Sequence, residues 1–221
     1  MKTYFVDPYI LKTNSLKVAW EPTPHGIALA KGMTKVPSVM CGKSLIEIGT
    51  GSGFHAILAL KLGARYIDVT DIESSILLEA KENATANGVE FRHSWVKNWM
   101  DFDPQKDKYD FVLCNPPFAK AEKGNRRWFI SEMIRSSRKF LNRGGYLMFS
   151  QSGMANFKET EKELSEHGYS YEVVHKSRGI FRDYYFTEED FIKESEEVEG
   201  GFEIIDGVYI ETLQVYLCTI K

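Results

Sequence analysis

The chain has 221 residues, 43% of them hydrophobic and 27% charged, which is enough apolar material for one globular core. Its 28 lysines and arginines against 31 aspartates and glutamates give a net charge of −3, which argues against a strongly basic nucleic acid-binding chain. It contains no run of about 18 apolar residues, which argues against a membrane-spanning helix.

Short apolar runs alternate with helical patterns, which indicates an α/β fold with a mostly parallel sheet. We expect the first core strand at 43–48, a helix at 54–62, a second strand at 66–70 and a helix at 73–87. A weaker strand at 89–93 precedes a strong one at 109–114, which two prolines terminate.

The later elements are less regular. The pattern predicts a helix at 127–141, a strand at 146–150, a helix at 156–167, an extended segment at 169–175 and a last strand at 212–220. The acidic stretch 187–201 is either a helix or a surface excursion. Residues 1–40 precede the first core strand, and we expect them to form a small N-terminal extension over the active site, with the main domain at 41–221.

A glycine-rich turn follows the first core strand. Glycines at the carboxyl edge of a parallel sheet let the backbone approach a bound nucleoside closely. A turn that binds a nicotinamide dinucleotide needs a glycine where this chain has Phe54, so we disfavour an oxidoreductase. An acid inside the strand can organise the turn or reach the ligand's amine through water. The candidate cofactor-binding residues here are Glu47, Gly49, Thr50, Gly51 and Gly53.

An aspartate, Asp71, ends the second strand. A carboxylate in this place can accept hydrogen bonds from both ribose hydroxyls of a nucleoside. Alternatively, Asp71 caps the helix that starts near Glu73. The order of strand, glycine turn and acidic strand end favours ligand binding, and we include Ile72 with the cofactor site.

These residues resemble the core of class I S-adenosylmethionine-dependent methyltransferases from about Lys43 to Ser150. The resemblance implies S-adenosylmethionine as cofactor and a Rossmann-like, seven-stranded, mostly parallel sheet with helices on both faces. It also implies that the segment Glu21–Gly26 closes over the methyl donor, where Thr23 or His25 touches the cofactor, although His25 as a plain helix-start residue is equally expected. The family's adenine contact, usually acidic, falls near Trp95 or Asn98.

The turn Asn115-Pro116-Pro117-Phe118 follows the strong strand. A nitrogen on a conjugated system is a poor nucleophile, and two acceptors for its hydrogens concentrate electron density on it. The Asn115 side chain and the Pro116 carbonyl can be those acceptors, while Pro117 stiffens the turn and Phe118 offers a flat stacking face. The alternative is a plain proline turn with an asparagine cap. We take all four as candidate catalytic residues, with Asn115 also near the cofactor.

This tetrapeptide resembles the motif of adenine-N6 methyltransferases and of the glutamine methyltransferases that modify release factors and ribosomal proteins. The resemblance implies methylation of a planar amide or amino nitrogen, in a protein glutamine or in nucleic acid adenine. Phe118 leans toward adenine, whereas the acidic balance and the tail Gly179–Tyr185 lean toward glutamine. A basic cluster (Lys120, Lys123, Arg126 and Arg127) leaves an RNA or DNA contact open, and Glu188–Asp190 is most simply a solvated face.

Two other functions stay open: a small-molecule methyltransferase, and a non-catalytic module that keeps the cofactor fold. Three widely spaced cysteines (Cys41, Cys114 and Cys218) and five scattered histidines give no metal-ligand spacing, so we expect no metal. Reduced thiols and the lack of a signal-like start predict a cytoplasmic protein with no membrane partner. The expected partner is a macromolecular substrate, and nothing in the sequence indicates an oligomeric state.

Overall fold

The computed structural model describes residues 1–14, 21–101, 103, 108–118 and 123–220. The helices are α1 (Pro24–Lys35), α2 (Phe54–Lys61), α3 (Ser74–Ala86), α4 (Trp128–Ser137), α5 (Phe157–Glu166) and α6 (Phe191–Glu196). The strands are β1 (Lys2–Val6), β2 (Tyr9–Thr13), β3 (Ser44–Ile48), β4 (Tyr66–Asp71), β5 (His93–Val96), β6 (Tyr109–Cys114), β7 (Leu141–Ser152), β8 (Tyr169–Ile180), β9 (Phe202–Ile205) and β10 (Val208–Ile220). None of the described helices is long and apolar enough to cross a membrane.

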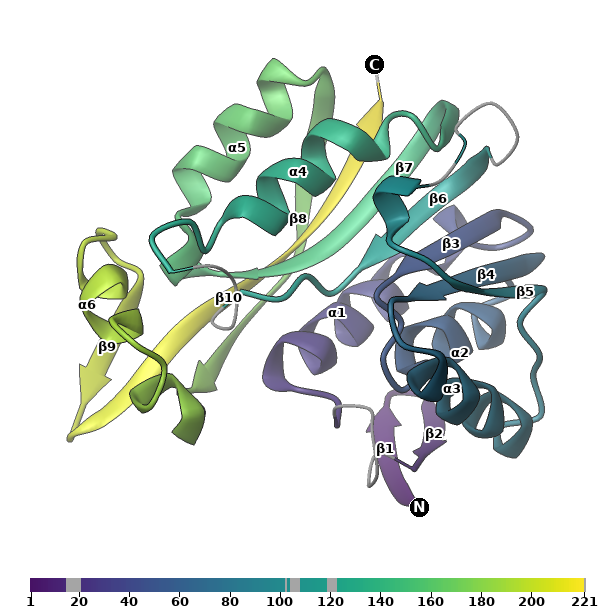
Figure 1. Cartoon of the computed structure of the whole chain (residues 1–221), viewed down its shortest axis with the longest axis horizontal. Helices are drawn as coiled ribbons and strands as arrows, with labels where there is room; N and C mark the ends of the chain where they lie inside the picture. The colour runs from purple at the N-terminus through teal and green to yellow at the C-terminus, as the bar shows by residue number, and fades with distance from the viewer. Residues whose placement is uncertain (15–20, 102, 104–107, 119–122, 221) are drawn as a thin grey trace.

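The main sheet has the strand order β5-β4-β3-β6-β7-β10-β8, and β9 pairs with β10 outside this path (Figure 1). Strands β5, β4, β3, β6 and β7 run parallel, whereas β10 is antiparallel to both β7 and β8. The expected Rossmann-like α/β fold is therefore confirmed, and β9 makes the sheet eight-stranded instead of seven-stranded. Ile48 pairs with both Thr70 and Cys114, so β3, β4 and β6 end side by side.

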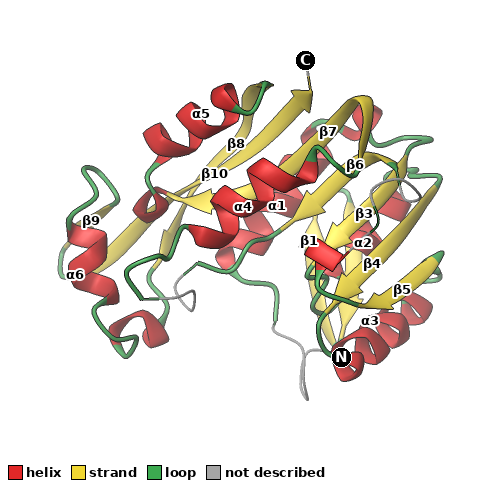
Figure 2. Ribbon diagram, turned by 45° about the horizontal axis from the view of Figure 1, so that its top comes forward, coloured by secondary structure: helices red, strands yellow, loops and turns green. Residues whose placement is uncertain are grey.

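Successive residues of the sheet face two separate hydrophobic cores. Leu45 and Phe111 face the core that α1, α2 and α3 cover, with Leu29 and Leu58 among its fully buried residues. Ile46 and Val112 face the opposite core, which side chains of α4, α5 and α6 fill. Figure 2 shows α3 and α5 on opposite sides of the sheet. Both faces are thus buried, as the continuous apolar runs of the parallel strands require.

The described residues ahead of β3 contribute to the same core as α2 and α3. Strands β1 and β2 form an antiparallel hairpin that packs on α2 and α3, and Asn83 Oδ1 of α3 accepts a hydrogen bond from the Asn14 amide at 2.7 Å. Helix α1 packs against β7, β8 and β10, and its Leu29 and Met33 are fully buried. This packing fixes the start of α1 against the sheet.

Several element boundaries differ from the sequence prediction, and two of the differences have a physical reason in the contacts nearby. The strand expected at 89–93 is β5 at His93–Val96, because Phe91 is buried against α3 and the glycine turn and does not join the ladder. The helix expected at 127–141 ends at Ser137. The Phe140 carbonyl already accepts a hydrogen bond from the Tyr109 amide at 2.7 Å, so the chain has joined the sheet by that point.

The last two long strands enclose an insertion, residues 181–207. Strand β8 is longer than the extended segment expected at 169–175, and it pairs along β10 as far as Ile180. Between them lie the short helix η4 (Asp183–Phe186), α6 and β9, at the left of Figure 1. The acidic stretch 187–201 contains α6, and Phe191 of this helix is fully buried. The insertion therefore belongs to the folded core.

Candidate active site

A cavity of about 420 Å³ lies at the carboxyl ends of β3, β4 and β6. The start of α1, the glycine turn, the end of β4, the turn after β6 and η4 contribute its walls. It gathers most of the residues that the sequence predicted for the site: Gly49, Thr50, Gly51, Asp71, Ile72, Asn115, Pro116, Pro117 and Phe118. Three predicted residues, Glu47, Gly53 and Trp95, do not line it.

The glycine turn leaves open space on its cavity side. Gly49 and Gly51 both have positive φ, and a Cβ at either position would meet no protein atom within 4 Å. Gly53 has a different role, because a Cβ there would lie 3.1 Å from the Phe91 ring and 3.3 Å from Ala80. The first two glycines thus keep space for a ligand, whereas Gly53 permits close packing of α3 on the turn.

Glu47 lies behind the turn and is 1% exposed. Its carboxylate accepts a hydrogen bond from the Thr50 hydroxyl at 2.6 Å and contacts His55 Nδ1 at 3.1 Å. His55 Nε2 lies 2.9 Å from the Gly26 carbonyl oxygen, which links the turn to α1. Burial, with the charge of Glu47, raises the pKa of the neighbouring Cys114 thiol well above its usual value. Glu47 therefore organises the turn from inside the protein.

The Asp71 carboxylate lies across the turn. It accepts hydrogen bonds from the Gly51 amide at 3.1 Å and from the Ile72 amide at 2.8 Å. The residue at the N-cap of α3 is Glu73, and no side chain accepts a capping hydrogen bond there. Asp71 therefore does not cap this helix. Ile72 beside it is 70% exposed and lines the cavity. An acceptor for hydroxyl groups and an exposed apolar side chain thus occur at one edge of the cavity.

The two candidates for an adenine contact lie elsewhere. The Trp95 ring packs on the core that α4 covers, 5.3 Å from the His93 ring. The Asn98 side chain accepts a hydrogen bond from the Met100 amide at 3.1 Å, at the start of the short helix η2 (Trp99–Asp101). Side chains alternate between the two faces of a strand, and Trp95 is on the face that packs against the core covered by α4.

The Asn115-Pro116-Pro117-Phe118 turn forms another part of the cavity wall. Asn115 Oδ1 accepts a hydrogen bond from the Ser150 hydroxyl at 2.7 Å, and a Cβ at Gly26 would lie 3.7 Å from Asn115 Nδ2. Ser150 is buried on the neighbouring strand β7. The Phe118 ring is 8% exposed and meets the Phe191 ring edge-on, with centroids 5.7 Å apart. Asn115 is thus held in orientation, and Phe118 reaches the cavity from a packed position.

The β8–β10 insertion supplies the remaining wall through Arg182, Tyr184 and Tyr185. Behind them, Glu211 of β10 is completely buried and contacts His25 Nε2 at 3.0 Å. Tyr185 donates a hydrogen bond to Glu211 at 3.4 Å. Burial raises the pKa of Tyr184 and, much further, that of Tyr185. Sequence reasoning considered His25 alone and missed Glu211, because their pairing spans 186 residues of chain.

A family model described as the methyltransferase small domain matches residues 29–181. The chain belongs to this family. It is 28% identical over 169 residues to a Methanocaldococcus jannaschii protein provisionally named a protein N5-glutamine methyltransferase, covering 70% of this chain and 82% of that one. It is 34% identical over 127 residues to a ribosomal protein L11 methyltransferase of Lactobacillus gasseri, covering 57% of this chain and 36% of the other.

A solved structure gives the same fold. A Pyrococcus horikoshii protein, provisionally named an RNA methyltransferase, superimposes with a TM-score of 0.60 at 19% identity, covering 90% of this chain and 85% of that one. The chain spans only about a third of the Lactobacillus gasseri enzyme's length. The family assignment confirms that the protein is a methyltransferase.

The described residues of the basic cluster predicted from the sequence form ion pairs with acidic residues of this methyltransferase. Lys123 forms ion pairs with Glu189 and Asp190, Arg126 pairs with Glu194, and Arg127 pairs with Glu163. Lys120 lies outside the described residues. Glu189 and Asp190 are exposed, as expected for a solvated face, and in addition they pair with Lys123.

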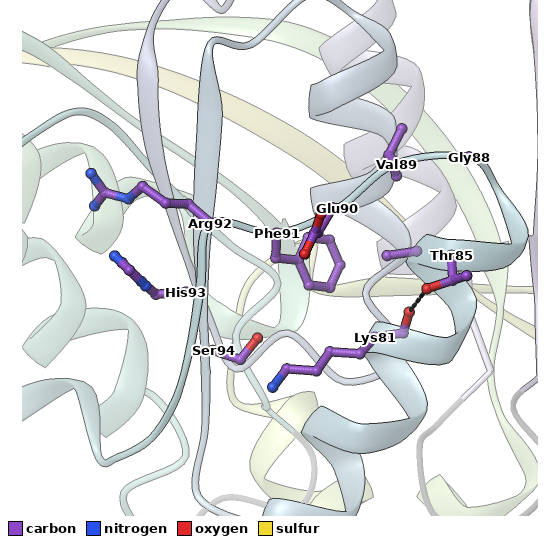
Figure 3. A pocket seen from close by; sticks show the side chains of 10 residues that line it. Lys81, Thr85, Gly88, Val89, Glu90, Phe91, Arg92, His93 and Ser94 are labelled. Atoms are coloured by element: carbon purple, nitrogen blue, oxygen red, sulfur yellow. Dashed lines mark hydrogen bonds between the residues drawn. The ribbon is translucent and has the colours of Figure 1, made fainter.

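A larger, open depression of about 840 Å³ lies elsewhere, between α3 and the segment that leads into the edge strand β5. Figure 3 shows Lys81 and Thr85 on one side of it and the chain from Gly88 to Ser94 on the other. None of the predicted site residues lines this depression. Among the described residues, no group of three or more His, Cys, Asp or Glu side chains could hold a metal ion.

Proposed function

We propose that this methyltransferase uses S-adenosylmethionine and methylates the side-chain amide nitrogen of a glutamine in a protein. The observation that carries the proposal is the Asn115 side chain, which Ser150 orients in the same cavity that Gly51 and Asp71 line. The cavity thus holds both an acceptor for a substrate N–H group, at Asn115, and residues suited to a nucleoside, at Gly51 and Asp71. Its volume suits a small ligand.

The residues present fit the methyl donor. The open space beside Gly49 and Gly51 suits a chain that passes close to the backbone, the Asp71 carboxylate suits ribose hydroxyls, and the exposed Ile72 suits an apolar purine face. Bound there, S-adenosylmethionine would supply an electrophilic methyl group. The chain itself then has to bind, orient and polarise the acceptor nitrogen.

The Asn115 turn is suited to that task. The amide lone pair of glutamine is delocalised into its carbonyl, so the nitrogen needs help as a nucleophile. Asn115 Oδ1 has two lone pairs, and the Ser150 hydroxyl occupies one of them, which leaves the other for a substrate N–H. The Pro116 carbonyl would accept the second hydrogen, and Pro117 restricts the backbone that carries both acceptors. Positioning of this kind can supply up to about 7–11 kcal/mol of barrier reduction.

Charge supports glutamine over adenine. A nucleic acid substrate needs cations that are free to meet phosphates. In the described part of the loop after Phe118, Lys123, Arg126 and Arg127 already pair with acids of the same chain. Phe118 is largely buried against Phe191, which leaves little of its face for stacking a base. The names of the two relatives, a protein N5-glutamine methyltransferase and a ribosomal protein methyltransferase, point the same way.

The test is transfer of a radiolabelled methyl group from S-adenosylmethionine to fractionated cell extract. We expect label in the protein fraction, released as methylamine on acid hydrolysis because that treatment cleaves the substituted amide. Asn115→Ala serves as the matched control and should remove the label. Label in adenine of RNA or DNA would replace glutamine by adenine, and label in a small molecule would indicate a metabolite enzyme. Cofactor binding without transfer to any fraction would support the non-catalytic module.

A further inference from the structure

A buried acid–histidine pair lies in the wall of the cavity. His25, near the start of α1, has Nε2 at 3.1 and 3.0 Å from the two carboxylate oxygens of Glu211. The Glu211 side chain is completely buried and that of His25 is 12% exposed. Burying a carboxylate is costly unless strong donors compensate it. Such a pair beside a cleft is therefore a candidate for function as well as for structure.

The hydrogen bonds fix the direction of the imidazole. Glu211 accepts from the Tyr185 hydroxyl at 3.4 Å, and because burial raises the pKa of Tyr185 far above its usual value, this phenol keeps its proton. The remaining donor that faces the carboxylate is His25 Nε2–H. The other ring nitrogen, Nδ1, makes no hydrogen bond to any described residue. An imidazole with Nε2–H bound to a carboxylate has its lone pair on Nδ1.

The pair is next to the acceptor motif. His25, Tyr185 and Asn115 line the same cavity. Gly26, directly after His25, is so close to Asn115 that a Cβ on it would lie 3.7 Å from Asn115 Nδ2. A substrate nitrogen held by Asn115 would thus share the cavity with the imidazole. Methylation of an amide nitrogen releases one of its protons, and the Asn115 side-chain amide is not a base.

We propose that His25 accepts the proton that the substrate nitrogen loses, and that Glu211 and Tyr185 are positioning residues that hold its imidazole. This inference rests on the proposed function. As the bond between nitrogen and the methyl carbon forms, the bond between that carbon and the sulfonium sulfur breaks, and its electron pair stays on sulfur. Once the methyl group is attached, one of the two N–H protons leaves its acceptor in the Asn115 turn and moves to His25 Nδ1, and the imidazolium that results is paired with Glu211. The products are a methylated amide, a thioether and a proton that passes to solvent from His25.

Other ionisable groups face the same space. Glu21 lines the cavity from the chain ahead of α1, Arg182 and Tyr184 line it from the insertion, and Asp71 lines it from the end of β4. His55 contacts the carbonyl of Gly26. A pH–rate profile therefore contains contributions from these groups, and only the part that changes with His25 and Glu211 reports on the pair.

The test measures initial rates of label transfer to the protein fraction between about pH 5 and pH 9 for matched variants. His25→Asn keeps a donor toward Glu211, and it should lower the maximal rate about 10²-fold or more, with the affinity for S-adenosylhomocysteine changed less than about twofold. The acid limb of the profile should disappear. Added imidazole should restore part of the rate of His25→Ala. His93→Asn, an exposed histidine outside the site, should leave rate and profile unchanged.

Glu211→Gln separates positioning from simple packing. It keeps shape and an acceptor oxygen but removes the charge that pairs with the imidazolium, so the acid limb should move to lower pH and the plateau should fall. His25→Asn with the wild-type rate and an intact acid limb would overturn the inference while the proposed function stands. If the wild-type protein transfers no methyl group to nitrogen, both fail. An unchanged profile in Glu211→Gln would leave Glu211 as a packing residue and overturn its assigned role.

Discussion

Nδ1 of His55 lies 3.1 Å from Oε1 of Glu47, and the two side chains are 8% and 1% exposed. On the other side of the ring, Nε2 faces the Gly26 carbonyl oxygen at 2.9 Å. A carbonyl oxygen only accepts, so Nε2 carries a hydrogen, and a proton must also lie between Nδ1 and the carboxylate. This bridge ties the glycine turn to α1. His55 therefore connects the residue after His25 with the acid that organises the glycine turn.

We expect His55→Ala to lower the free energy of unfolding by about 3 kcal/mol or more, because it leaves one oxygen of the buried Glu47 carboxylate without its histidine partner. Urea unfolding at neutral pH measures the change as a shift of midpoint at constant slope. His93→Ala, at an exposed position, is the matched control and should change the midpoint little. Equal, small shifts for both variants would show that the bridge adds no stability.

Asp71→Ala should weaken binding of S-adenosylmethionine by about 1.5–3 kcal/mol through loss of charge-assisted hydrogen bonds. Titration calorimetry measures this directly. Glu82→Ala on the exposed face of α3 removes the same charge without touching the cavity and should bind as the wild type does. If Asp71→Ala keeps its affinity, the carboxylate serves only the Gly51 and Ile72 amides that it contacts in the structure.

The parts of the fold that a contiguous sequence pattern determines could be predicted from the sequence. The buried parallel strands are apolar runs, and the glycine turn and the Asn115 turn are contiguous motifs that fix their own places at strand ends. Strand β5 was misplaced because the burial of Phe91 depends on its contact with the glycine turn at Gly53, which no local pattern around Phe91 indicates. The boundary of α4 depends on the hydrogen bond between Tyr109 and Phe140 in the same way.

The site was predictable only in its contiguous parts. Ser150 orients Asn115 across 35 residues of chain, and Glu211 meets His25 across 186. No local pattern marks a serine at the end of an apolar strand as a partner of one particular asparagine. The pairing of Arg126 with Glu194 could not be predicted either, because 68 residues of chain separate them. Such contacts follow from the strand order, which had to be observed.

The ion pair between Arg126 and Glu194 should contribute measurable stability. Arg126 is 8% exposed, so Glu194→Ala would leave a buried guanidinium without its carboxylate, at a cost of about 2–4 kcal/mol. The pair of Lys158 with Glu199 is the matched control, since both of its side chains are almost fully exposed and Glu199→Ala should cost less than about 0.5 kcal/mol. Denaturant unfolding compares the two variants, and equal small effects would contradict the prediction.

Acid should remove the stabilisation that the Asp110 carboxylate provides at the amino ends of β3 and β6. Burial alone would raise the pKa of Asp110, but hydrogen bonds from Ser44 and Asn142 outweigh it and hold the pKa below its ordinary value of 3.8. A carboxyl group whose pKa is lower in the folded than in the unfolded state stabilises the protein at pH values above its unfolded-state pKa. This stabilisation is lost as the pH falls through its folded-state pKa. Asp110→Asn should therefore cost about 1–2 kcal/mol at pH 7 and progressively less below about pH 4. A cost independent of pH would mean that the charge has no part in it.

Asn115 should act on the rate of methyl transfer and not on binding of the methyl donor. Asn115→Ala should leave the affinity for S-adenosylhomocysteine nearly unchanged. The Asn115 side chain is oriented by Ser150, whereas the nucleoside is expected to bind at Asp71. It should lower the rate of methyl transfer about 10²-fold or more, as expected when a preorganised partner of the transition state is removed.

Ser150→Ala tests the same mechanism from one step away. The amide stays but loses the hydrogen bond that orients it, so the rate should fall by about 3–30-fold, less than for Asn115→Ala. The double variant should then be no slower than Asn115→Ala alone, because Ser150 acts only through the amide that is already gone. Single-turnover label transfer separates these rates from product release. If the two losses multiply, Ser150 has a role of its own in the site, and if Asn115→Ala transfers methyl at the wild-type rate, the nitrogen-acceptor mechanism is wrong.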